Sequence, residues 1–114
     1  MKNFLLILFI LPLVAFSQEA TKWQVNQAEK VASYVIEKLD LIEEDAIFFK
    51  KVNLTQIVEN ANNIKESGAS TQEEKKSIYA RGRANLKSKL SKRFGRKVAQ
   101  QLMSSINESR KLIN

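Results

Sequence analysis

The chain has 114 residues, with 19 Lys and Arg against 12 Asp and Glu, and it contains neither cysteine nor histidine. Their absence excludes disulfides, removes the usual ligands of zinc, copper and haem, and removes the commonest general base at neutral pH. Serines are present, but no strand-turn-helix nucleophile elbow accompanies them. We therefore expect no enzyme activity, no metal and no cofactor.

The N-terminus has the order of a secretory signal peptide. A positive start, Met1 to Asn3, precedes an apolar run from Phe4 to Phe16, and the run ends in the small-x-small triplet Ala15-Phe16-Ser17. This order predicts a signal peptide over 1–17, cleavage between Ser17 and Gln18, and a periplasmic or secreted protein. An uncleaved membrane anchor is the alternative, but a spanning helix needs about 20 apolar residues without an internal proline.

The remaining residues, 18–114, are expected to form a single all-helical domain. The only proline lies in the signal segment, and no stretch alternates as a strand does. Apolar residues recur at three- and four-residue steps, which predicts helices over about 21–41, 43–66, 72–90 and 91–112. Short linkers favour antiparallel neighbours, so we predict an antiparallel helical hairpin of about four helices. The joint between the last two helices, at Leu90 and Ser91, is either a break or a kink.

Local signals mark the expected helix ends. Thr21 with Gln24, and Thr71 with Glu74, have the spacing of capping boxes. Gly68 fits a left-handed C-terminal cap, and Ser91 is expected to cap the last helix. The second helix should bury one stripe, consisting of Ile47, Leu54, Ile57, Val58, Ala61 and Ile64.

Basic residues are concentrated late in the chain. The segment from Arg81 to Lys97 has eight Lys or Arg and no acid: Arg81, Arg83, Lys87, Lys89, Lys92, Arg93, Arg96 and Lys97. Such a segment indicates binding to acidic proteins or to an anionic membrane surface, with a solvated helix face as the alternative. Nucleic acid is disfavoured because few aromatics accompany the segment.

Aromatic residues supply the apolar part of the candidate binding surface. Phe48 and Phe49 point about 100° apart on a helix, so one of them should be partly exposed or lie at a dimer contact. With Phe94, they complete a candidate surface in which apolar rings are rimmed by Lys and Arg.

Two segments resemble a known family. Leu39-Asp40-Leu41-Ile42-Glu43-Glu44-Asp45 is similar to the Leu-x-Leu-Thr-x-x-Gln element of small periplasmic helical proteins, the Spy/CpxP-type stress chaperones and their LTxxQ relatives. Leu90-Ser91-Lys92-Arg93-Phe94 falls where the second copy would be. Both copies are degenerate, since Ile42 replaces Thr, Asp45 replaces Gln, and Phe94 replaces Gln. The degenerate motif positions are Leu41, Asp45, Leu90 and Ser91.

This resemblance implies an ATP-independent homodimer that shields unfolded envelope proteins or modulates a stress sensor. Two rival functions remain open. In the first, a helix from Ser91 lies on a membrane surface with Phe94, Val98 and Leu102 facing the lipid. In the second, the protein is a structural subunit that fits one specific partner.

Overall fold

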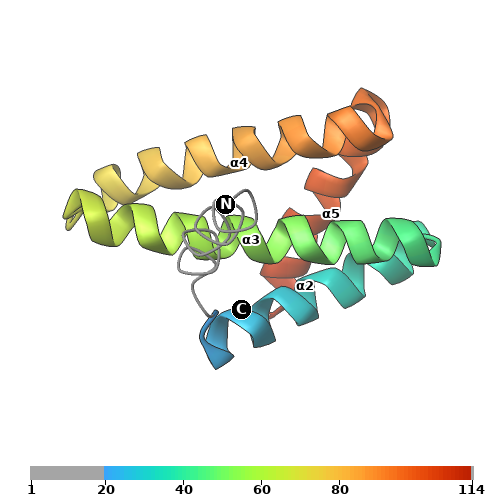
Figure 1. The fold of residues 1–114 in the computed structure, drawn as a ribbon, viewed down its shortest axis with the longest axis horizontal. Coiled ribbons are helices and arrows are strands. Elements are labelled where there is room, and N and C mark those ends of the chain that lie inside the picture. The colour runs from blue at the N-terminus through green and yellow to red at the C-terminus, as the bar shows by residue number, and fades with distance from the viewer. Residues whose placement is uncertain (1–19, 114) are drawn as a thin grey trace, which may run out of the picture.

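Four helices make up the described part of the chain. The computed structural model describes residues 20–113, and the expected signal peptide and its cleavage site lie outside that range. The helices are α2 (Lys22–Leu39), α3 (Glu43–Ser67), α4 (Gln72–Phe94) and α5 (Arg96–Ile113) (Figure 1). No strand occurs among residues 20–113, so the predicted all-α class is confirmed.

The helices are arranged as a ring of neighbours. α3 and α4 run antiparallel as a long hairpin, and α2 and α5 cover one side of it (Figure 1). α2 packs against α3 and α5, and α4 packs against the same two helices, whereas α2 does not pack against α4. Because α2 and α4 do not pack directly against each other, only side chains can fill the space in the middle of the four helices.

Capping residues fix the helix ends as predicted. The Thr21 hydroxyl accepts the Gln24 N–H at 3.1 Å, and the Gln24 side chain accepts the Thr21 N–H at 2.9 Å. Thr71 and Glu74 repeat this box at 3.2 and 3.1 Å, which satisfies free N–H groups of the first turn of α4. Gly68 ends α3 with φ 72°, so the predicted left-handed cap is confirmed.

The α4–α5 joint is a break, and it lies at Gly95 rather than at Ser91. α4 continues through Ser91 to Phe94, and the Ser91 carbonyl accepts the Gly95 N–H at 2.8 Å. Gly95 then takes φ 90° and ψ 161°, a conformation open essentially to glycine alone. The predicted N-cap at Ser91 is therefore wrong, because the chain turns where the glycine permits it.

The core is built mainly from α2, α4 and α5. α2 contributes Ala28, Val31, Ala32 and Val35, all of them buried. Fully buried partners on the other helices are Phe49, Leu90, Ala99, Leu102 and Ile106. Removing this apolar surface from water is the main term that holds the four helices together.

The inner face of α3 differs from the predicted stripe. Its buried residues are Phe49, Asn53 and Gln56, whereas Ile47 is 61% exposed. Polar amides can occupy a core position when hydrogen bonds satisfy them. The predicted apolar stripe is wrong at this position because Gln56 can be buried there: it has hydrogen-bond partners on both hairpin helices, described below.

Candidate functional site

The two motif segments chosen from the sequence meet at one end of the hairpin. Arg93, near the end of α4, donates to the Asp45 carboxylate in the first turn of α3 at 3.3 Å. The Arg93 guanidinium lies 4.7 Å from the centre of the Phe48 ring, and Phe48 meets Phe94 edge-to-face at 5.9 Å. We call Asp45, Phe48, Arg93 and Phe94 the end cluster. It is a salt bridge combined with a cation–π contact on an aromatic pair.

Several predicted site residues lie inside the molecule. Phe49 and Leu90 are both 0% exposed, so they belong to the core and offer no surface to a partner. Leu41 is half-buried and packs against the core, and Ser91 is half-buried within α4. The assignment of Phe49 to a binding surface is corrected, because it is buried on the inner face of α3. Phe48 is half-buried, as expected for one ring of the pair.

The basic segment is solvated but spread around its helices. All eight residues are exposed except Lys89, which is half-buried. Helical spacing separates them: Arg81 faces a groove beside α3, whereas Arg83 faces the space between the four helices. Lys92 and Arg93 lie at the end of α4, and Arg96 and Lys97 open α5.

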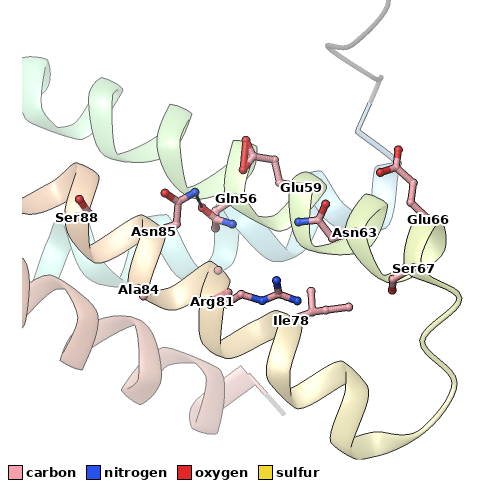
Figure 2. A pocket seen from close by; sticks show the side chains of 11 residues that line it. Gln56, Glu59, Asn63, Glu66, Ser67, Ile78, Arg81, Ala84, Asn85 and Ser88 are labelled. Carbon is pink, nitrogen blue, oxygen red and sulfur yellow. Dashed lines mark hydrogen bonds between the residues drawn. The ribbon is translucent and has the colours of Figure 1, made fainter.

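A shallow polar groove of about 760 Å³ runs between α3 and α4 (Figure 2). Asn85 on α4 donates to Gln56 on α3 at 3.2 Å, and Figure 2 shows these two side chains pointing toward each other. Arg81 shares the groove with Glu59 and Glu66, so charges of both signs line it. Because the two glutamates outnumber the arginine, the groove is not complementary to an anion.

A glycine lets α3 and α4 approach closely. Gln56 also donates to Asn60 at 3.0 Å, and Asn60 lies directly against Gly82 of α4. A Cβ at position 82 would stand 2.9 Å from Asn60 Cγ, and closer still to its Oδ1. Gly82 costs helix propensity, and in return it accommodates the amide network across the seam.

A cavity of about 820 Å³ lies between all four helices. Its cationic lining residues are Lys76 and Arg83 of α4 and Arg110 of α5, and no acidic side chain lines it. Trp23 and Tyr79, which are 68% and 44% exposed, also line it. Its apolar walls include Val31, Ile57, Ala61, Leu86, Met103 and Ile106.

The cavity also contains a buried polar group without a partner. Asn53 is 1% exposed, and its Nδ2 is the one buried side-chain nitrogen or oxygen among residues 20–113 that has no hydrogen-bond partner. Such an atom costs free energy, because it has lost its hydrogen bonds to water.

Sequence reasoning missed this cavity. Lys76, Tyr79 and Arg83 follow the three- and four-residue steps of one helix face, which was an available signal. Arg110 and Asn53 carried no such signal, because their roles depend on how distant helices pack.

A third cluster joins α2 to α5. Glu108 accepts hydrogen bonds from Lys38 and from the Tyr34 hydroxyl, the latter at 2.5 Å. The Lys38 ammonium, followed by the Tyr34 hydroxyl, lowers the pKa of Glu108 below its usual range. The hydrogen bond to Glu108 raises the pKa of both Tyr34 and Lys38. All three side chains are solvent-accessible, so the cluster is a surface brace between two helices.

Within residues 20–113, no set of three or more acidic side chains is grouped so that it could hold a metal ion. In the same part of the chain, none of the helices has the length and hydrophobicity needed to span a bilayer.

Comparison of the chain with protein-family models, with curated proteins and with solved structures finds no match. The resemblance to the periplasmic LTxxQ family therefore stays a prediction.

Proposed function

We propose that this protein is an exported, non-catalytic binding protein that holds unfolded, acidic segments of envelope proteins without ATP. The observation that carries the proposal is the surface at the end of the hairpin where α3 begins and α4 ends. Half-buried aromatic rings, exposed isoleucines and four cations all occur at this end of the hairpin. We call this the basic end surface: Ile42, Ile47, Phe48, Phe94, Lys92, Arg93, Arg96 and Lys97.

The apolar part of this surface is unusually open. Ile42 and Ile47 are 64% and 61% exposed, although a small domain gains stability by burying such side chains. Phe48 and Phe94, which pack edge-to-face against each other, add partly covered rings at the same end of the hairpin. Exposed apolar groups rimmed by charge are typical of sites that bind other proteins.

The cations of this surface favour an acidic partner. Lys92, Arg96 and Lys97 are exposed, and no salt bridge holds them among the described residues. Arg93 is different, because Asp45 already neutralises it. Long-range attraction would bring an acidic segment to this end, and the apolar groups would then hold it weakly.

The burial of the proposed lipid-facing side chains argues against the membrane-surface alternative. Leu102 is 0% exposed, and Val98 and Phe94 are half-buried against the core. Leu102 therefore faces the interior of the folded protein, and Val98 and Phe94 have only part of their surface free for a lipid.

The test is suppression of aggregation, without ATP, of an unrelated acidic protein diluted from denaturant. Light scattering should fall in the presence of the parent protein, and high salt should abolish the effect because it screens exposed charges. The triple variant Lys92→Gln, Arg96→Gln, Lys97→Gln should suppress aggregation much less. The matched control, Lys22→Gln, Lys30→Gln, Lys65→Gln, removes the same charge away from this end and should behave as the parent. Equal activity of the two triple variants would refute the proposal.

A further inference from the structure

The cavity between the four helices carries a concentration of positive charge that the basic end surface does not explain. Lys76, Arg83 and Arg110 line it, and they come from two helices. No carboxylate lines the cavity, whereas two glutamates, Glu59 and Glu66, line the groove that contains Arg81. The cavity is therefore electrostatically complementary to an anion.

The positive charge in the cavity lowers the stability of the folded protein. Partial desolvation of the Arg110 guanidinium, together with the like charge of Arg83, lowers the pKa of Arg110. The unpartnered Asn53 amide is a second cost at the same place. Sites that violate the ordinary packing rules are often functional ones, because a ligand can supply the missing interactions.

The rest of the lining combines polar amide side chains, such as Gln27 and Asn60, with a substantial apolar wall. Val31, Leu86, Met103 and Ile106 come from three helices, and the rings of Trp23 and Tyr79 add exposed aromatic surface. The volume of about 820 Å³ lies within the range of sites for small organic ligands. An inorganic anion would leave most of this apolar wall uncovered.

We propose that the cavity binds a single-chain amphiphile with an anionic head group. Arg83 and Arg110 hold the head group, and the chain lies against Val31, Leu86, Met103 and Ile106. The inference goes beyond the proposed function, since it uses a different surface and a small ligand rather than a protein segment.

The chain offers a built-in reporter. Trp23 is the only tryptophan and it lines the cavity, so its fluorescence should change when a ligand enters. The probe is dodecanoate, kept below its micelle concentration and titrated into the purified protein, with calorimetry as the second measurement. Saturable binding should be seen with dodecanoate and with dodecyl phosphate. Acetate and inorganic phosphate lack the chain, and dodecyltrimethylammonium has the opposite charge, so each should bind at least tenfold more weakly.

Two variants separate a ligand site from a structural feature. Arg83→Gln should weaken dodecanoate binding about tenfold or more, because one charged hydrogen bond is worth that much. Arg81→Gln lies on the other side of the same helix and should bind as the parent. Without ligand, Arg83→Gln should melt no lower than the parent, because removing one arginine relieves the repulsion.

A third variant tests the cavity itself. Ala61→Phe fills the space without changing charge, and it should abolish dodecanoate binding while leaving aggregation suppression at the basic end surface intact. Failure of dodecanoate to bind the parent, equal binding by the Arg83 and Arg81 variants, or equal affinity for the cationic amphiphile would each overturn the inference. None of these results would bear on the basic end surface.

Discussion

The two halves of the hairpin are built on different principles. Near the α4–α5 joint, α3 and α4 meet α2 and α5 through fully buried apolar side chains such as Phe49, Leu90 and Leu102. Toward the hairpin turn, α3 instead presents Gln56 and Asn60 to α4, and a cavity replaces the core. We call these the packed half and the open half.

Charge follows the same division. In the packed half, Arg93 is paired with Asp45. In the open half, Arg83 and Arg110 face a cavity that no acid lines. The difference indicates that the packed half supplies most of the stability, while the open half sacrifices stability for a polar, cationic interior.

The largest expected effect on stability comes from removing a buried ring in the packed half. Phe49→Ala should destabilise the protein by about 3–5 kcal/mol, because it leaves a cavity in a core that cannot collapse around it. Ile47→Ala, two residues away and exposed, should cost less than about 0.5 kcal/mol. Chemical denaturation of both variants checks the pair. Similar losses for the two would mean that the inner face of α3 has been assigned incorrectly.

The turn beyond the open half contains Gly68, whose role depends on its backbone conformation. Gly68 has φ 72° and open space around its Cα, so a side chain there meets strain but no clash. Gly68→Val should therefore cost about 1–2 kcal/mol, since L-residues tolerate the left-handed region poorly. Gly68→Asn is the matched control, because asparagine tolerates this conformation better, and it should cost less. Thermal melts in which valine matched asparagine would contradict the cap.

The seam between α3 and α4 gives a smaller effect with a more specific signature. Gly82→Ala forces Asn60 aside, and the overpacking cost of about 1–3 kcal/mol is offset by about 1 kcal/mol of helix propensity. We expect a net loss of about 1 kcal/mol. With Asn60→Ala already in place, the same Gly82→Ala change should become neutral or stabilising. A double-mutant cycle by denaturation measures this. Independent effects of the two changes would show that Asn60 does not depend on the glycine.

The helix ends were predictable from the sequence because capping acts within a few residues. Thr21, Thr71 and Gly68 each have their partners inside one turn, so their roles could be read locally. The α4–α5 break was misplaced by four residues because Ser91 and Gly95 both carry local signals, and the glycine prevailed.

The inner face of α3 and the cavity were not predictable in the same way. Gln56 is buried because Asn85 donates to it across the hairpin, and periodicity within α3 contains no information about that partner. The sequence shows the basic run of α4, but it does not show which of these basic residues line the cavity. Arg83 faces Arg110 only because α5 returns past α4 after the break at Gly95.

The smallest predicted effect concerns the brace between α2 and α5 and its dependence on pH. Lys38 and Tyr34 lower the pKa of Glu108 in the folded protein, so its contribution is complete above the unfolded pKa near 4.5 and is lost as pH falls through the lower, folded pKa. The pKa of Lys38 is raised, so its contribution is complete below about 10.5 and is lost as pH rises through the folded value.

Removing one partner should therefore change one limb of the stability–pH profile more than the other. Glu108→Gln should flatten the acid limb below pH 4.5, without abolishing it, since backbone N–H groups at Thr71 and Ser70 also lower the pKa of Glu74. Lys38→Gln should flatten the alkaline limb above pH 10.5. Because the groups are solvent-accessible, both differences should shrink in high salt. Melting temperatures of parent and variants across this range decide the matter, with exposed Glu37→Gln as the control. An acid limb unchanged by Glu108→Gln, at low salt, would mean that the brace contributes nothing to joining α2 and α5.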